Sequence, residues 1–148
     1  TRRVSLVNKK ARFDYEIIES YEAGIMLTGA EVKSVRSGGV NFAGARVLLD
    51  ESGARIIGLN ILKYKYDSSD EYDAARPKKI LLHKKEIMEI LTKSRSAGLT
   101  LVPIKLYNKG SLVKVQIALV RGKKMYEKRA AIKKRDIEAG LARRLKNN

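Results

Sequence analysis

Apolar and polar residues alternate over two neighbouring stretches in the C-terminal half of the chain. The apolar positions are spaced two apart, namely Val102, Ile104 and Leu106 in the first stretch and Val113, Val115, Ile117 and Leu119 in the second. A turn at residues 108–110, which contains a glycine, separates the two stretches. This arrangement is typical of a half-buried β-hairpin. It predicts strands over residues 99–107 and 112–119, each with its alternate apolar residues on one face.

Two further stretches have strand character. The first is rich in β-favouring residues, namely Tyr15, Ile17, Ile18 and Tyr21, and predicts a strand over residues 14–25. The second is a pair of apolar runs at residues 46–49 and 55–61, joined by the polar segment 50–53. Its turn chemistry predicts a second hairpin.

Helix signals occur at two places. Thr28 and Glu31 form a capping box, in which each side chain satisfies a free backbone amide at a helix start. We expect a short helix there, with Val32 and Val35 facing the core and the glycines at 38–39 ending it. A second helix is predicted over residues 83–97, with one apolar face formed by Ile87, Ile90 and Leu91.

The predicted order is five or more strands with two helices between them. This order indicates a mainly β fold, an antiparallel sheet with helices at its ends. Closing such a sheet into a small barrel removes its exposed edges, so a barrel is the expected architecture.

Composition excludes several classes of protein. The chain has 148 residues, which is enough for one domain with its own core, and it contains no cysteine. A disulfide scaffold, a thiolate metal site and a cysteine nucleophile are therefore excluded. Its apolar runs are shorter than a membrane span requires, and the basic N-terminus lacks the apolar core of a secretory signal. We expect a cytoplasmic protein without a membrane partner.

Net charge is the strongest compositional feature. The chain carries 32 basic and 16 acidic residues, for a net charge of +16, and residues 121–148 hold 11 of the basic and 3 of the acidic ones. Lysine and arginine that neutralise phosphates release condensed counterions, so a polyanion is the expected partner. A merely soluble basic protein and a membrane-surface protein are alternatives, but the C-terminal region lacks the large apolar face that membrane insertion needs. Nucleic acid is favoured.

Three regions follow from these patterns. Residues 1–12 form a basic N-terminal segment that we expect to be mobile until it binds something. Residues 13–122 form an RNA-binding β-barrel domain, and residues 123–148 form a basic C-terminal tail. The tail has a weak apolar stripe at Ile137, Leu141 and Leu145, which predicts a helix that forms on binding.

Residues that could support catalysis are few. His83 is the single histidine, so a zinc ligand set is absent, and neither a nucleophile elbow nor a phosphate-binding glycine loop occurs. Glu22 and Glu31 could form an acid–base pair, but Glu31 is already assigned to the helix cap. The carboxylates at 67–73 could be taken for a metal site, although an exposed, solvated loop is the simpler interpretation. We expect a binding protein without enzymatic activity, metal or cofactor.

Tyrosines interleave with basic residues, as on many RNA-stacking surfaces, at Tyr64, Tyr66, Tyr72, Tyr107 and Tyr126. Taken singly, the first four are more simply core or rim residues. Tyr126 differs because it lies in a basic context beyond the last predicted strand.

An ordered set of short motifs extends over nearly the whole chain, from Asn8 to Leu145. They are Asn8–Arg12, Tyr21–Ile25, Gly29–Gly38, Arg76–Glu86, Gly98–Pro103 and Arg121–Lys124 with Lys128–Arg129. In this order they resemble the SmpB (small protein B) family, the bacterial partners of transfer-messenger RNA (tmRNA). No single motif is diagnostic; the order is.

The resemblance implies a fold and a function. The fold is a six-stranded antiparallel OB-like β-barrel with two or three helices, and the protein is a monomer. The barrel binds the tRNA-like domain of tmRNA, which elongation factor Tu delivers in alanylated form to a stalled ribosome. The tail then becomes helical in the empty mRNA channel, near the decoding centre and mainly against small-subunit rRNA. This is the adaptor of trans-translation.

The resemblance also implies site residues. Glu22, Leu81, His83 and Lys114 match the tmRNA-binding surface, and we add the basic neighbours Lys33, Arg36 and Lys84. Lys114 suits a phosphate, an exposed Leu81 suits an unstacked base, and Glu22 either accepts hydrogen bonds from RNA or orients a lysine. In the tail, the decoding-site positions are Lys123, Lys124, Tyr126, Lys128 and Arg129, to which we add Glu127, Lys133, Lys134 and Arg135.

The sequence departs from the family pattern at three places. Glu127 replaces a usual aspartate, residues 42–45 lack the common Asp-Ser-Tyr, and residues 72–74 stand where His-Asp-Pro is frequent. Two other functions remain open on the residues alone. One is a structural ribosomal-type rRNA-binding protein with a basic extension, and the other is an RNA-processing enzyme that uses Glu22 or Glu31 with Mg²⁺.

Overall fold

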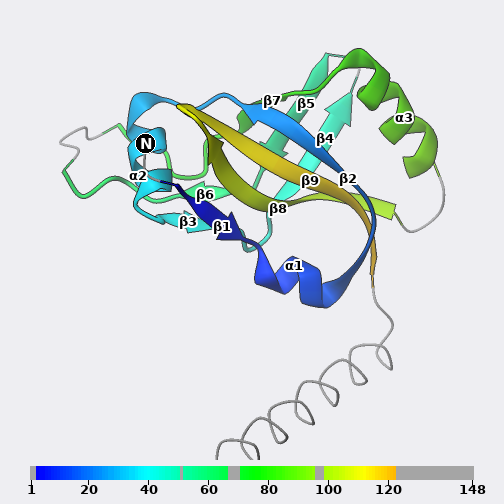
Figure 1. Ribbon diagram of the computed structural model, residues 1–148, viewed down its shortest axis with the longest axis horizontal. Coiled ribbons are helices and arrows are strands. Elements are labelled where there is room, and N and C mark those ends of the chain that lie inside the picture. Colours follow the sequence, from blue (N-terminus) through cyan, green and yellow to red (C-terminus); the bar gives the residue numbers. More distant parts are fainter. Residues whose placement is uncertain (1–2, 51, 67–70, 96–98, 123–148) are drawn as a thin grey trace, which may run out of the picture.

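The computed structural model describes residues 3–50, 52–66, 71–95 and 99–122 (Figure 1). Nine strands and three helices occur in this part of the chain. They are β1 (Ser5–Val7), α1 (Lys9–Asp14), β2 (Tyr15–Ile25), α2 (Gly29–Arg36), β3 (Val40–Asn41), β4 (Arg46–Asp50), β5 (Gly53–Ile57), β6 (Asn60–Ile61), β7 (Lys78–Leu81), α3 (Lys84–Ser94), β8 (Leu99–Lys109) and β9 (Leu112–Gly122).

Seven strands form one antiparallel sheet in the order β1-β8-β9-β2-β7-β5-β4, and β3 pairs with β6 separately. The sheet is strongly curved (Figure 1), and β4 contacts β8 near the opposite end of the order. The expected mainly β, antiparallel, OB-like fold with two or three helices is confirmed. The main sheet has one strand more than the expected six, and in the described residues no ladder closes it into a complete barrel. No helix in the described part is long and apolar enough to cross a membrane.

The concave side of the sheet holds the main core. All four alternate apolar residues of β9 point into it, as the hairpin pattern predicts, and Ile117 and Leu119 are fully buried. Ile90 of α3 and Val35 of α2 fill the same core from the two helices. Each such side chain contributes about 1.5–3 kcal/mol by leaving water.

Strand β8 differs from its predicted pattern at one point. Its register with β9 shifts between Pro103 and Lys105, so that Ile104 is an extra residue. A bulge of this kind reverses the faces of the residues beyond it. Leu106 therefore lies in the main core, while Val102 and Ile104 lie in a second cluster with Ala11 of α1. The prediction that Val102, Ile104 and Leu106 share one face is wrong.

The predicted strand over residues 55–61 is interrupted at Gly58. This glycine has a φ of 74°, and a Cβ there would lie 2.4 Å from the carbonyl oxygen of Gly44. Only glycine permits so close an approach in the left-handed region. The chain turns here, so β5 stays in the main sheet while β6 pairs with β3.

The N-terminal segment is ordered from residue 5 onward. β1 pairs with β8, and α1 covers the second cluster (Figure 1). Asn8 is the N-cap of α1, accepting from the Ala11 amide at 3.1 Å and donating to the Pro103 carbonyl at 2.9 Å. The expectation that residues 1–12 are mobile is therefore wrong for residues 5–12. Short sequences can gain order from such long-range pairing, which periodicity does not detect.

Both predicted helices form. The capping box of Thr28 and Glu31 is present at the start of α2, and Val35 is buried, while Val32 packs partly against the core. α3 is described to Ser94, and residues 96–97 of its predicted range lie outside the described residues.

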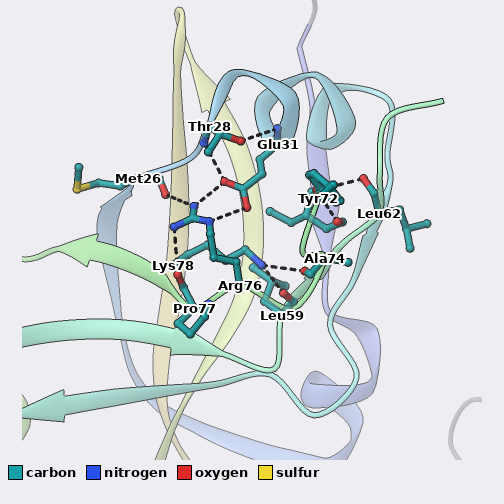
Figure 2. A network of polar contacts seen from close by, with 11 residues as sticks. Met26, Thr28, Glu31, Leu59, Leu62, Tyr72, Ala74, Arg76, Pro77 and Lys78 are labelled. Carbon is teal, nitrogen blue, oxygen red and sulfur yellow. Dashed lines mark hydrogen bonds and ion pairs between the residues drawn. The ribbon is translucent and has the colours of Figure 1, made fainter. Parts of the chain in front are cut away.

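A polar network holds the segment that leads into β7 (Figure 2). Arg76 donates to the Glu31 carboxylate, with one contact at 2.6 Å, and to the Met26 carbonyl at 3.3 Å. Lys78, which is fully buried, donates to the carbonyls of Leu59 at 2.6 Å and Ala74 at 3.1 Å. The network fixes where β7 enters the sheet, and β7 carries Leu81.

Candidate RNA-binding surface

Four residues lie side by side across the convex face of the sheet. Tyr107 of β8 is opposite Lys114 of β9, Lys114 is opposite Gly24 of β2, and Gly24 is opposite Leu81 of β7. Residues directly opposite in antiparallel strands have neighbouring side chains on the same face. We call these four residues the Lys114 row. Two of them, Lys114 and Leu81, are predicted tmRNA-binding residues, and they come from strands far apart in the sequence.

Gly24 leaves room at the centre of the Lys114 row. A Cβ at this glycine would lie 3.6 Å from Leu81 Cβ and 3.9 Å from Lys114 Nζ. The ammonium group therefore lies over the glycine, beside the apolar side chain of Leu81. Leu81 is 57% exposed, which is high for a leucine in a strand. The row offers a cation and an apolar surface next to each other, as a phosphate and an unstacked base require.

Glu22 lies two residues before Gly24, on the same face of β2. Tyr107 donates its hydroxyl to one Glu22 oxygen, and Lys109 Nζ is 3.5 Å from the other. The hydrogen bond from Tyr107 lowers the pKa of Glu22 below its ordinary value, and Lys109 and Lys114 act in the same direction. The carboxylate is therefore ionised and held in one orientation at neutral pH. It remains half exposed, so its other lone pairs are accessible.

The hydroxyl and the ring of Tyr107 each have a partner. Burial and the hydrogen bond to Glu22 raise its pKa, so the hydroxyl keeps its proton and remains a donor. Lys105 Nζ lies 5.3 Å from the centre of the tyrosine ring, at cation–π distance. Tyr107 thus joins Glu22, Lys105 and the Lys114 row into one cluster.

The remaining predicted residues lie at two places. His83 and Lys84 are exposed at the N-terminus of α3, just after Leu81, where the His83 amide donates to Glu86 at 3.1 Å. Lys33 and Arg36 are exposed in the last turn of α2. Among the described residues, no hydrogen bond or ion pair joins either pair to the Lys114 row.

The predicted tail residues lie outside the described residues, namely Lys123, Lys124, Tyr126, Glu127, Lys128, Arg129, Lys133, Lys134 and Arg135. The described chain ends at Gly122 of β9, which pairs with Tyr15 of β2. β9 therefore ends at the side of the sheet where α1 packs (Figure 1).

Sequence reasoning missed two members of this surface. Gly24 and Tyr107 were not predicted as site residues, although Tyr107 was noted among the tyrosines near basic residues. The predicted turn at residues 108–110 does not give the pairing of Tyr107. In the structure β8 continues to Lys109, which is opposite Leu112, so Tyr107 is opposite Lys114. The described residues contain no cluster of three or more acidic or histidine side chains that could hold a metal ion.

Three comparisons bear on the family. The model of the SmpB protein family matches residues 5–147. An SsrA-binding protein of Persephonella marina is 46% identical over 97% of this chain and 95% of its own length, and one of Mesoplasma florum is 48% identical over 97% of each chain. A solved structure, described as "tmRNA-SmpB: a journey to the center of the bacterial ribosome", has a TM-score of 0.70 and 45% identity over 82% of this chain and 85% of its own.

The family match and the identities cover almost the entire chain, including every strand of the Lys114 row. The resemblance drawn from the short motifs is therefore confirmed at the level of the whole sequence. This chain belongs to the SmpB protein family.

Proposed function

We propose that this protein binds the tRNA-like domain of tmRNA and brings it to stalled ribosomes as the adaptor of trans-translation. The observation that carries the proposal is the Lys114 row with Glu22 beside it, where a cation, an apolar side chain and a fixed carboxylate meet on an open face. Relatives that share nearly half of the sequence are SsrA-binding proteins, and a solved structure with 45% identity is described as tmRNA-SmpB. The net charge of +16 supports an RNA partner.

Each group in the cluster has a distinct role. Lys114 pairs with a backbone phosphate, and Leu81 packs against an unstacked base. Glu22 accepts a hydrogen bond from a ribose 2′-hydroxyl or a base amino group. The contacts of Glu22 also favour its second predicted role, since the same carboxylate holds Lys109 in place. Lys33, Arg36, His83 and Lys84 contact flanking phosphates of the same RNA.

The tail performs the second half of the function. Residues 123–148 enter the empty mRNA channel, become helical and neutralise small-subunit rRNA near the decoding centre, with Tyr126 stacking on an exposed base. The alanylated tmRNA arrives with elongation factor Tu in the bacterial cytoplasm. This division predicts that the body selects the RNA and the tail acts on the ribosome.

We also propose that the protein acts by binding alone. The alternative of a Mg²⁺-dependent nuclease requires Glu22 or Glu31 as a free ligand. Glu31 is buried, and its two oxygens accept from Thr28 and Arg76. Glu22 is held by Tyr107 and Lys109. Glu31 is thus committed to partners within the protein. Glu22 keeps lone pairs that are open to RNA, but the positive charges of Lys109 and Lys114 beside it disfavour a Mg²⁺ ion at that carboxylate.

A competition experiment tests this function. Labelled tRNA-like domain is titrated with the full chain and with a chain cut after Gly122, each in excess elongator tRNA at near-physiological salt. We expect nanomolar affinity in both cases, the range of specific nucleic-acid modules, and peptide tagging on stalled ribosomes only with the full chain. If competitor tRNA abolished binding, the proposal of an adaptor would be wrong. The alternative of a ribosomal-type rRNA-binding protein would then be favoured.

A further inference from the structure

A second row of residues crosses the same convex face next to the Lys114 row. Leu48 of β4 is opposite Arg55 of β5, and Arg55 is opposite Lys79 of β7. The Met26 amide donates to the Lys79 carbonyl at 2.9 Å, which extends the row to the end of β2. We call these four residues the Arg55 row. All four side chains are exposed.

Two cations face each other in this row. Like charges directly opposite in antiparallel strands destabilise the sheet. The ion pairs in the described part of the chain involve Arg76, Lys93 and Lys109, and neither Arg55 nor Lys79 is among them. The nearby acid, Asp50, accepts from the Ser52 amide at 2.9 Å, and its hydrogen bonds with Ser52 lower its pKa more than Arg55 does. A repulsive pair at an exposed position suits a polyanion that neutralises both charges on binding.

The shape of the surface agrees with an extended anion. A hollow of about 340 Å³ lies beside the row, near the turn between β4 and β5. It is lined by Arg55, Lys79, Asp50 and Pro77. Met26 is 52% exposed, and its side chain points away from the buried network (Figure 2). Leu48 is 37% exposed at the other end of the row. Apolar side chains flanking paired cations can pack against sugars and bases while the cations hold phosphates.

The two rows are continuous. Lys79 and Leu81 are alternate residues of β7, and Met26 and Gly24 are alternate residues of β2, so both rows lie on one face. Three interstrand steps at about 4.8 Å each and an offset of two residues along the strands separate Arg55 from Lys114, which is roughly 16 Å. Two or three nucleotides of one RNA strand span that distance. An RNA strand bound at Lys114 can therefore reach the Arg55 row.

We propose that the Arg55 row is a second contact surface for the same RNA, with Arg55 and Lys79 binding backbone phosphates of the tRNA-like domain of tmRNA. This inference rests on the proposed function and extends the RNA-binding surface to strands β4, β5 and β7. Of the predicted site residues, only Leu81 lies on these three strands. It makes the RNA footprint a band across the sheet and adds two charged contacts to it.

The test measures how tmRNA affinity depends on salt. The double variant Arg55→Ala/Lys79→Ala is compared with the full wild-type chain, using the labelled tRNA-like domain over a series of KCl concentrations. Two lost phosphate contacts reduce the slope of log K against log[KCl] by about 1.5 to 2. The matched control Lys63→Ala/Lys65→Ala removes the same charge from the exposed segment after β6, and its slope stays at the wild-type value.

The variant Lys114→Ala, run in parallel, separates the two proposals. A reduced slope for Lys114→Ala alone overturns the Arg55 row and leaves the proposed function standing. If neither variant reduces the slope, the phosphate contacts of the Arg55 row and of Lys114 are both overturned. If only Arg55→Ala/Lys79→Ala reduces the slope, the Arg55 row is supported and Lys114 is removed from the contact surface. Thermal melting checks folding: removing the facing cations should leave the midpoint unchanged or raise it, because their repulsion is lost.

Discussion

Glu22 and Glu31 lie close together in the sequence, and each has a hydrogen-bonding partner from a distant segment, but their surroundings differ completely. The side chain of Glu31 is 2% exposed and is held by Thr28 and Arg76, whereas that of Glu22 is 43% exposed. The comparison shows that burial decides what a carboxylate does in this fold. The buried one stabilises the structure, and the exposed one is available to a ligand.

The largest expected effect is on stability, and it comes from breaking the contact between Arg76 and the buried Glu31. Arg76→Ala leaves the Glu31 carboxylate buried with only the Thr28 amide, and it also removes the bonds to Met26 and Pro77. We expect a loss of about 2–3 kcal/mol in the free energy of unfolding, below the usual cost of a fully buried pair because the arginine itself is 40% exposed. Urea unfolding measures this difference.

Arg55→Ala is the matched control for that measurement. It removes an exposed strand arginine with no ion pair among the described residues, so its effect should stay within about 0.5 kcal/mol. Equal losses for Arg76→Ala and Arg55→Ala would mean that the buried network adds nothing to stability.

The next effect concerns the pH dependence of that network. Burial raises the pKa of Glu31, but the hydrogen bonds from Arg76 and Thr28 outweigh it, and the folded-state pKa lies below the ordinary value. A depressed carboxyl pKa contributes stability above the unfolded pKa of about 4.3, and this contribution is lost as pH falls through the folded value. The wild type should therefore exceed Glu31→Gln in stability near pH 7, with the gap closing below about pH 4.3. A gap that is constant with pH would contradict the ionised assignment.

The sequence alone predicted only part of the difference between the two glutamates. The Thr28–Glu31 capping box is a local pattern, so it could be predicted together with α2 and with the alternating residues of β9. The partner of Glu31, however, is Arg76, 45 positions away, and only the fold brings the two together. The same holds for the Lys114 row, whose members are set by strand register rather than by spacing along the chain.

Local irregularities account for the other errors. The bulge at Ile104 and the turn at Gly58 each change the face or the partner of a strand, and neither has a hydrophobic pattern of its own. β1 has three residues, too few to establish a period of two. The resemblance to a family supplied the site residues, while the geometry added Gly24 and Tyr107.

The smallest expected change in stability, and the most direct test of the exposed contact, is Tyr107→Phe. The variant keeps the ring beneath Lys105 but removes the hydroxyl that is the main cause of the lowered Glu22 pKa. The Glu22 pKa should rise toward its ordinary value, the urea midpoint should stay unchanged, and affinity for the tRNA-like domain should fall about fivefold. Carboxyl carbon chemical shifts report the pKa, and RNA titration reports the affinity.

A double-mutant cycle with Glu22→Gln shows whether Tyr107 acts through Glu22. If the tyrosine only positions the carboxylate, it has nothing left to position once Glu22 is replaced, and the double variant should bind RNA no more weakly than Glu22→Gln alone. Additive losses would mean instead that Tyr107 contacts the RNA itself, through its ring or hydroxyl. Either result refines the comparison with Glu31. If replacing Tyr107 lowers RNA affinity without lowering stability, Glu22 belongs to the binding surface rather than to the core.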